Sequence, residues 1–279
     1  MQPRFVDLHT HTTASDGTDA PRDLIRRAAS LKLAAVAVTD HDTVSGLDEA
    51  EAAGREYGVE IIRGCELGVQ GQYGEIHLLG LWLPRHSAPL DAELARLRGH
   101  REERNLKILD RLRSIGINIG YQEVLDEAGG ESVGRPHIAR VLQKRGIYYG
   151  AAYVPRTLLT PEEGVSLMAD LGAVVSFAHP MLIRCPPSWF DEIIPRLKEA
   201  GLGAIEAYHS EHSARDERFC VELAARYGLG LSGGSDYHGM AKPGVELGRG
   251  KGGLRVTVAL LDALKARRKR PVDDAPEVL

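Results

Sequence analysis

The feature that most constrains this chain is a pair of histidines placed at the end of its first apolar run. Residues 4–8 have the composition of a buried strand, and His9 and His11 follow it directly, with Asp16 shortly after. Alternate residues of an extended chain face the same side, so we expect the two imidazoles to lie close together. The carboxyl ends of strands are where α/β barrels place their chemistry. One such pair is a weak signal unless other groups occupy the same position in later strands.

The same position recurs along the chain. Apolar runs at residues 34–38, 173–177 and 229–232 also end in imidazole or carboxylate groups, and runs at 59–62 and 76–81 precede or contain one. The nine groups are His9, His11, Asp16, His41, Glu66, His77, His179, Asp236 and His238. A lone histidine of this kind is more often hydrogen-bonded scaffolding than a ligand. Nine are hard to explain in that way, because buried carboxylates without balancing cations are costly.

The pattern therefore predicts a site for several metal ions. Imidazole and carboxylate ligands without a pair of thiolates suit manganese, iron or zinc, and suit magnesium less well. The three cysteines lie far apart in the sequence, so neither a disulfide framework nor a zinc ribbon is expected.

Length and charge narrow the class of protein. A chain of 279 residues, 43% of them apolar, can form one large α/β domain or a domain with an insertion. The formal charge of −4 argues against stable binding to duplex nucleic acid, so a small-molecule partner is expected. The cytoplasm is the expected compartment, because the first residues contain no apolar signal region and no apolar run approaches the roughly 20 residues of a membrane span.

A change of pattern in the middle of the chain predicts an insertion. Strand and helix signals alternate over residues 1–84 and again over 162–279, but residues 85–161 contain almost only helix signals. A long helix expected at 90–115 carries a row of arginines on its polar side. That row is either a solvated face or a wall that faces an anion above the active site.

Another helix of the insertion is expected to begin at Gly134. Arg135 and His137 fall in its first turn. The free backbone N–H groups and the helix dipole favour an anion at such an end. Phosphate binding and simple capping with packing are both open interpretations of these two residues.

The order of the motifs resembles the PHP superfamily, named after polymerases and histidinol phosphatase. The residues that carry the resemblance are His-Thr-His-Thr-x-x-Ser-Asp-Gly from His9, Thr-Asp-His-Asp from Thr39, Gly-Cys-Glu from Gly64, Ile-His-Leu-Leu-Gly from Ile76, Gly-Arg-Pro-His-Ile-Ala from Gly134, Ala-His-Pro from Ala178 and Gly-Ser-Asp-Tyr-His from Gly234. They span almost the whole chain. The resemblance is greatest to the branch of metal-dependent phosphoesterases that act on nucleoside 3',5'-bisphosphates and short oligonucleotides. It implies a distorted seven-stranded β/α barrel, the PHP fold, with a mostly helical insertion arching over the metals.

The resemblance also implies three metal positions, with manganese as the expected ion and iron(II) or zinc as alternatives. The first would be held by His9, His11, Glu66 and Asp236, the second by Glu66, His77 and His179, and the third by Asp16, His41 and His238. Asp7 and Asp40 adjoin ligand histidines and are either groups that orient those ligands or strand-end packing. Three divalent ions and three carboxylates sum to about +3, a charge that attracts phosphate.

The implied reaction is hydrolysis of the 3'-phosphate of nucleoside 3',5'-bisphosphates, and of short oligonucleotides from the 5' end. Metals would activate a water so that hydroxide attacks phosphorus in line. Arg135 and His137 resemble insertion residues that grip a substrate phosphate and assist catalysis, and His212 could bind phosphate or protonate the leaving oxygen. Arg184 offers one more anion contact, in a loop that departs from the pattern of this branch.

Two alternatives belong to other functional classes. One is a histidinol phosphate phosphatase of the same superfamily, which the Gly-Arg-Pro-His-Ile-Ala motif argues against. The other is a non-catalytic, metal-stabilised nucleotide-binding module, which the complete set of ligand residues argues against.

Overall fold

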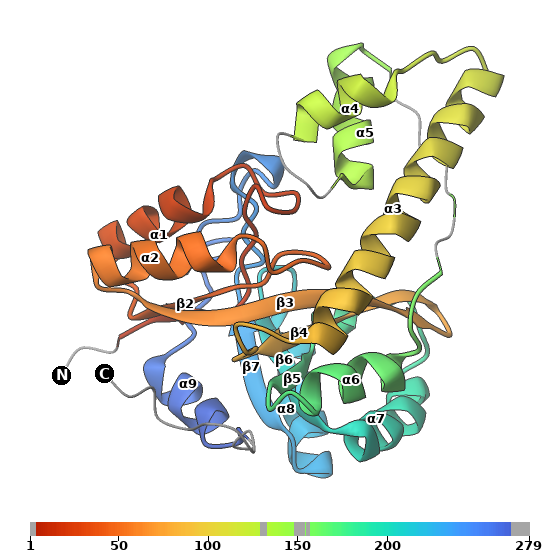
Figure 1. Cartoon of the computed structure of the whole chain (residues 1–279). Helices are drawn as coiled ribbons and strands as arrows, with labels where there is room; N and C mark the ends of the chain where they lie inside the picture. The colour runs from red at the N-terminus through yellow and green to blue at the C-terminus, as the bar shows by residue number, and fades with distance from the viewer. Residues whose placement is uncertain (1–3, 129–132, 148–153, 155–156, 269–279) are drawn as a thin grey trace.

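A seven-stranded sheet lies at the centre of the molecule, surrounded by helices (Figure 1). The computed structural model describes residues 4–128, 133–147, 154 and 157–268. The strands, which are neighbours in chain order, are β1 (Val6–Asp7), β2 (Ala35–Val38), β3 (Glu60–Gly71), β4 (Gly74–Leu81), β5 (Val174–Phe177), β6 (Leu202–His209) and β7 (Gly230–Gly234). Every neighbouring pair is parallel except that β4 runs antiparallel to both β3 and β5. The carboxyl ends of the parallel strands therefore open at one edge.

The first and last strands come together and nearly close the sheet into a barrel. The backbone N–H of Leu8 donates to the carbonyl of Gly233 over 3.3 Å, and the N–H of Asp236 donates to the carbonyl of His9 over 2.9 Å. These bonds bring the first and last histidine-containing segments side by side. The predicted fold class, a distorted β/α barrel of seven strands, is confirmed.

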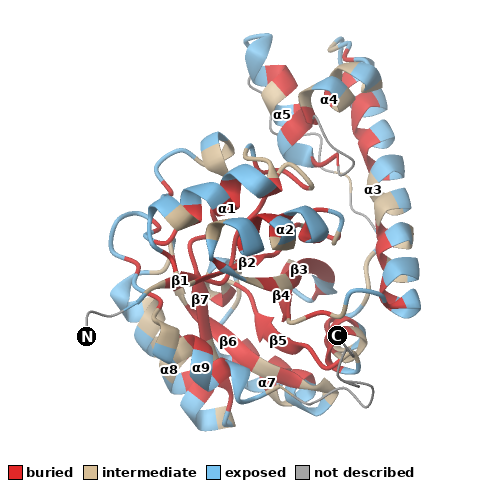
Figure 2. Cartoon of the chain, turned by 60° about the vertical axis from the view of Figure 1, so that its left-hand side comes forward, coloured by how far each residue is buried: buried red, intermediate tan, exposed pale blue. Residues whose placement is uncertain are grey.

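Helices cover the outside of this barrel because each has one apolar stripe that the sheet buries. They are α1 (Pro21–Ser30), α2 (Leu47–Tyr57), α6 (Pro161–Ala169), α7 (Ser188–Ala200), α8 (Ala214–Tyr227) and α9 (Val258–Lys265). In α1, for example, Leu24, Ile25 and Ala28 are fully buried, whereas the arginines between them are exposed. Figure 2 shows this division, with buried positions on the strands and on the helix faces that meet them. None of the described helices is long and apolar enough to cross a lipid bilayer.

Between β4 and α6 the structure describes three helices, α3 (Ala88–Ser114), α4 (Tyr121–Ala128) and α5 (Arg135–Lys144). Figure 1 shows α3 leaving the barrel at a slant, with α4 and α5 standing beside its far half. The near half of α3 packs into the barrel core through Leu90, Leu94 and Leu97. Its far half contributes to a separate apolar cluster that includes residues of α4 and α5. The division of the chain at residues 85 and 161 stays a prediction.

One strand is longer in the structure than the sequence pattern predicts. The strand expected at 59–62 continues as β3 through Glu66 to Gly71, because its second half pairs with β4 as a hairpin. Glu66 therefore lies inside a strand rather than after one. Because β4 runs backwards, its beginning lies at the edge where the other strands end, which explains why His77 occurs early in its strand.

Candidate metal centre

The nine predicted ligands meet in one cluster at the edge of the barrel where the parallel strands end. They fall into overlapping groups of three or four residues whose ligand atoms lie within 4.8 Å of one another. The groups include His11 with Asp16, His41 and His238, and His9 with Glu66 and His179. Loops from almost every strand contribute, which is why residues up to 229 positions apart in the chain lie together.

Glu66 lies at the centre of the cluster. Its Oε2 lies 3.3 Å from His9 Nε2, 3.1 Å from His11 Nε2 and 3.0 Å from His41 Nδ1. Its Oε1 lies 2.8 Å from His77 Nδ1 and 2.9 Å from His179 Nε2. The two carboxylate oxygens thus face two different sets of imidazoles, as a group that bridges two ions must.

Two further carboxylates complete the arrangement. Asp236 Oδ1 lies 3.4 Å from His11 Nε2 and 3.6 Å from His9 Nε2. Asp16 Oδ1 lies 3.2 Å from His238 Nε2 and 3.9 Å from His41 Nε2. The assignment of each ligand to one of three ions stays a prediction.

The donor atoms of this cluster fit divalent ions. His9 Nε2, His11 Nε2 and Glu66 Oε2 are buried and close together, but none of them has a partner in hydrogen-bond geometry among the described residues. Buried polar atoms are normally hydrogen-bonded, and leaving them unpaired costs free energy that a shared cation would offset. Burial alone would raise the pKa of Glu66, but the imidazoles of His41, His77 and His9 lower it well below its usual value. The carboxylate is therefore ionised, as a metal ligand must be.

Glycines without room for a side chain hold two of the ligands in place. A Cβ at Gly234 would lie 2.4 Å from the Cβ of His9, and one at Gly17 would lie 2.5 Å from the carbonyl oxygen of His11. His179 and Asp236 themselves have positive φ angles, 28° and 54°. Such backbone strain in residues other than glycine is typical of functional sites.

Two adjoining pockets open at the cluster. One, of about 320 Å³, is lined by ligand residues and by Lys242. The other, of about 290 Å³, is lined by Arg101, Arg104 and Arg135, and we call it the arginine groove. Both pockets are also lined by Asp16, His41, His77 and Pro136, so the arginine groove is continuous with the metal cluster.

Comparison with known proteins gives the family. The PHP domain model matches residues 7–129. The phosphoribosyl 1,2-cyclic phosphate 1,2-diphosphodiesterase of Eggerthella lenta is 31% identical over 253 residues, which cover 84% of this chain and 94% of that protein. The chain belongs to the PHP family. A 3',5'-nucleoside bisphosphate phosphatase of Chromobacterium violaceum is also similar to this PHP protein, 30% identical over 282 residues and covering 96% of this chain and 99% of the relative.

Solved structures agree with the PHP assignment. A protein of Bifidobacterium adolescentis assigned as a metal-dependent phosphoesterase superimposes with a TM-score of 0.86 at 29% identity, covering 96% of this chain and 99% of that one. An amidohydrolase of Chromobacterium violaceum with bound sulfate and no metal gives a TM-score of 0.84 at 29% identity, with 96% and 98% covered. This PHP protein is a phosphoric ester hydrolase that uses divalent metal ions. The predicted class of function is confirmed, and the non-catalytic alternative is not supported.

Sequence reasoning missed Glu206, a fully buried residue of β6. Its Oε1 lies 2.9 Å from His9 Nδ1, and its Oε2 accepts the backbone N–H of His179 over 2.7 Å. Burial favours the neutral acid, but the nearby His9 lowers the pKa of Glu206 to about 2. An ionised carboxylate on Nδ1 leaves Nε2 of His9 facing the cluster. The sequence signal was an acidic residue inside an apolar strand.

Two more residues outside the nine predicted ligands contact Asp236. Nε2 of His209 lies 3.3 Å from Asp236 Oδ2, while its Nδ1 accepts the backbone N–H of Glu211. Lys242 Nζ donates to the same Asp236 oxygen over 2.7 Å. These contacts leave Oδ1 of Asp236 facing His9 and His11.

Asp7 and Asp40 hold loops rather than imidazole rings. Asp7 accepts the backbone N–H groups of Ser235 and Gly248 over 2.8 and 2.7 Å. Asp40 accepts the N–H of Thr12 over 2.7 Å and the hydroxyl of Ser15 over 2.6 Å. Of the two interpretations that the sequence allowed, the contacts favour packing at the strand ends over orientation of the ligand rings.

The predicted substrate residues of the insertion lie in different surroundings. Arg135 lines the arginine groove, with its Nη2 3.7 Å from Glu75 Oε2. His137 is fully buried, and its Nδ1 accepts the N–H of Gly134 over 2.8 Å, which caps α5. Burial and the charge of Arg140 lower the pKa of His137 to about 4, so its ring is neutral. Its Nε2 has no hydrogen-bond partner among the described residues, and it does not line the groove.

His212 and Arg184 lie outside the two pockets. The Nδ1 of His212 donates to the carbonyl of Ala207 over 2.9 Å, because a carbonyl can only accept, and its buried Nε2 has no hydrogen-bond partner among the described residues. Arg184 is exposed and lines neither pocket. The substrate roles of both residues stay predictions.

Proposed function

We propose that this PHP protein hydrolyses the 3'-phosphate of nucleoside 3',5'-bisphosphates, and short oligonucleotides from their 5' end, with three divalent ions and preferably manganese. The observation that carries this proposal is the continuity of the arginine groove with the metal cluster. A substrate with two phosphates can place one at the cluster and the other among the arginines. The name of the Chromobacterium violaceum relative, a 3',5'-nucleoside bisphosphate phosphatase, supports the same substrate class.

The arginine groove is chemically suited to the phosphate that is not cleaved. A guanidinium group offers two parallel N–H donors to phosphate oxygens and does not lose its charge. Arg101 is held in place by a buried ion pair with Asp42, so its position is fixed before substrate binds. Arg135 is half-exposed at the first turn of α5, where the helix dipole adds to its charge.

The cluster is suited to the phosphate that is cleaved. When bound, the ions would lower the pKa of a water and polarise the phosphoryl oxygens. We assign His9, His11, Glu66 and Asp236 to the first ion, Glu66, His77 and His179 to the second, and Asp16, His41 and His238 to the third. Glu206 keeps His9 in the tautomer that presents Nε2 to the cluster.

The hydrogen bond from His212 to Ala207 determines which ring nitrogen of His212 carries the proton. Its Nδ1 proton is committed to Ala207, so a neutral His212 ring has a lone pair on Nε2 and can accept a proton there but not give one. Protonating the leaving oxygen would require the doubly protonated ring. Lys242 lines the pocket at the cluster, and its positive charge can contact a phosphate bound there.

A second substrate class is favoured by the same two anion sites. The Eggerthella lenta relative is named for a phosphoribosyl 1,2-cyclic phosphate, which also carries two separate phosphate groups. Histidinol phosphate has one phosphate and would leave the arginines of the groove without an anion. The geometry therefore favours either substrate with two phosphates over the histidinol ester.

The test, with manganese, is phosphate release from adenosine 3',5'-bisphosphate, phosphoribosyl 1,2-cyclic phosphate and histidinol phosphate, and release of nucleoside monophosphates from a 5'-phosphorylated RNA. We expect the bisphosphate to be cleaved, His179→Ala to be inactive, and Arg135→Ala to raise KM about tenfold, because it removes one phosphate contact. Arg113→Ala, at the exposed end of α3, is the matched control and should change nothing. Cleavage of histidinol phosphate alone, or an unchanged KM in Arg135→Ala, would overturn the proposed substrate.

A further inference from the structure

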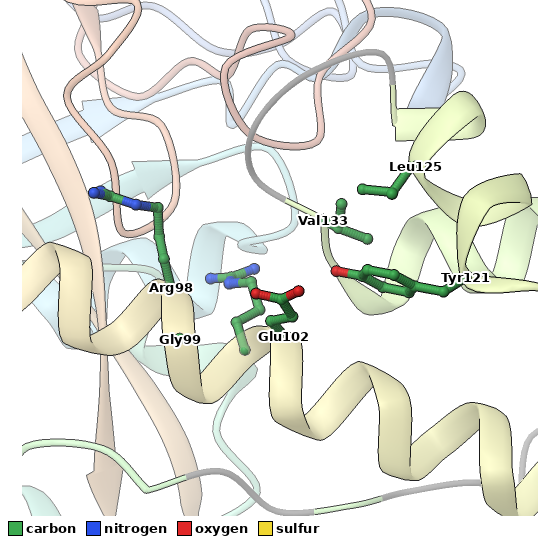
Figure 3. Close-up of a pocket in the computed structure, with 7 residues that line it drawn as sticks. Arg98, Gly99, Glu102, Tyr121, Leu125 and Val133 are labelled. Carbon is green, nitrogen blue, oxygen red and sulfur yellow. The ribbon is translucent and has the colours of Figure 1, made fainter.

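A third pocket, of about 310 Å³, lies between α3 and α4 of the insertion (Figure 3). One side is aromatic and apolar and is formed by Tyr121, Leu125 and Val133. The other side is formed by α3, with Arg98 and Glu102 one helical turn apart. Apolar side chains and a tyrosine opposite charged groups suit a ligand with an apolar body and polar edges, such as a planar heterocycle.

Gly99 also lines this pocket and is not explained by packing. It lies within a helix of 27 residues, where glycine is less favourable than alanine. A Cβ built at Gly99 would have no heavy atom within 4 Å. The helix therefore has space for a side chain there, and the absence of one leaves that space to the pocket.

Arg98 and Glu102 are available to a ligand in this pocket. Glu102 is exposed, and neither it nor Arg98 forms an ion pair or hydrogen bond with another described residue, although i,i+4 spacing allows the two to pair. Figure 3 shows the Glu102 carboxylate and the Tyr121 hydroxyl pointing toward one another, while Arg98 extends elsewhere. Burial and the charge of Glu102 raise the pKa of Tyr121, so the phenol stays protonated.

The third pocket adjoins the proposed phosphate site. Arg101 lines both this pocket and the arginine groove, and the groove is continuous with the metal cluster. A nucleotide whose phosphate is held by Arg101 has the third pocket beside it, where the base carried by its ribose can lie.

We propose that the third pocket binds the nucleobase of the substrate and that Glu102 selects guanine. A carboxylate only accepts hydrogen bonds, and its two oxygens match two adjacent donors. Guanine presents adjacent N1–H and N2–H donors on its Watson–Crick edge. Adenine and cytosine present one donor beside an acceptor, and uracil one donor between two carbonyls. This assignment rests on the proposed function, since it takes the substrate to be a nucleotide.

The test compares the binding of guanosine, inosine and adenosine 5'-monophosphates by titration calorimetry. These ligands lack the 3'-phosphate that the proposed reaction removes, so that reaction does not consume them during the titration. Inosine keeps N1–H and lacks the N2 amine. We expect the guanosine nucleotide to bind about tenfold more tightly than the adenosine nucleotide, with inosine between them. Hydrolysis of the guanosine and adenosine 3',5'-bisphosphates should show the same order in kcat/KM.

Three variants locate the effect. Glu102→Gln should abolish the preference for guanine, whereas Glu103→Gln, the neighbouring exposed residue outside the pocket, should keep it. Gly99→Leu should fill the pocket and weaken binding of the guanosine nucleotide roughly tenfold, without loss of the fold, since its Cβ meets no other atom.

The outcomes separate this inference from the proposed function. Equal binding of the three nucleotides, or an unchanged preference in Glu102→Gln, overturns the guanine assignment even if bisphosphates are cleaved. A preference that depends on Glu102, without cleavage of any bisphosphate, supports the base pocket and overturns the proposed reaction. No binding of any nucleotide overturns both.

Discussion

His9 Nδ1 and Glu206 Oε1 lie 2.9 Å apart, and both side chains are fully buried. The contact fixes the tautomer of His9 from β6, which is separated from β1 only by β7. We expect the strength of metal binding to depend on this residue, although it is not one of the nine predicted ligands.

We therefore expect Glu206→Gln to weaken manganese binding about 10–100-fold. Glutamine has the same shape but can present its N–H₂ to His9 and favour the other ring tautomer. Metal titration by calorimetry would measure the loss, and activity should recover at high manganese. Glu222→Gln, on the exposed face of α8, is the control. Equal metal affinity of Glu206→Gln and wild type would contradict the role assigned to this carboxylate.

Removal of metal should destabilise the fold. The cluster contains Asp16, Glu66 and Asp236, with Glu66 fully buried among imidazoles. An ion that binds only the folded state at 100 times its Kd contributes about 2.7 kcal/mol per site. We expect a chelator to lower the melting temperature and manganese to restore it.

The stabilisation by manganese should be much smaller in Asp236→Asn, because one charged ligand is lost. Asp262→Asn, exposed on α9, should behave as wild type. A melting temperature that does not depend on manganese would show that the cluster is not a high-affinity metal site.

The ion pair between Arg101 and Asp42 should link the insertion to the barrel energetically. The Asp42 side chain is 1% exposed and that of Arg101 is 11% exposed. Breaking a buried pair by neutralising one partner leaves the other charge unpaired, so Asp42→Asn should cost about 3 kcal/mol in urea unfolding. Asparagine tolerates the positive φ of 53° at this position and keeps an oxygen that can accept the Gly68 N–H, so the change removes the ion pair without straining the backbone.

Asp110→Asn is the matched control for this ion pair. Asp110 forms a pair with Arg113 in which both side chains are mostly exposed, and such pairs contribute less than about 1 kcal/mol. If the two substitutions cost the same, the contact with Asp42 does not anchor α3.

His137 should make stability depend on pH. Its pKa is lowered from 6.5 to about 4 in the folded protein, mainly by burial and then by Arg140. The unfolded chain therefore takes up the proton first, so this contribution to stability is complete above about pH 6.5 and is lost as the pH falls toward 4. His137→Gln keeps an acceptor for the Gly134 N–H and cannot titrate.

Wild type should lose free energy of unfolding between pH 6.5 and pH 4 because His137 titrates. We expect the loss in His137→Gln to be smaller by on the order of 2 kcal/mol. Urea unfolding at several pH values would measure the difference. His86→Gln, an exposed histidine before α3, should follow the wild-type profile. Parallel profiles for His137→Gln and wild type would show that the ring is protonated without cost and that its burial does not matter.

The sequence determined much of the fold and the identity of the cluster residues. Apolar runs and the polar residues that follow them are local features, so the alternation of strands and helices and the positions of His9, His41 and His179 could be deduced from the printed chain. The sequence did not predict the antiparallel hairpin of β3 and β4, because the composition of one strand does not determine which strand pairs with it.

Only the tertiary structure decided which residues support the cluster and which line the pockets beside it. Glu206 contacts a residue 197 positions away, and that contact exists because closure of the barrel leaves only β7 between β6 and the start of the chain. The Nδ1 of His137 accepts the N–H of Gly134 at the start of its own helix, a contact that its sequence position alone does not reveal, and its role toward phosphate stays a prediction. The pocket beside Gly99 requires α3 and α4 to pack at a particular distance. Such contacts depend on how distant segments pack, and local composition does not contain that information.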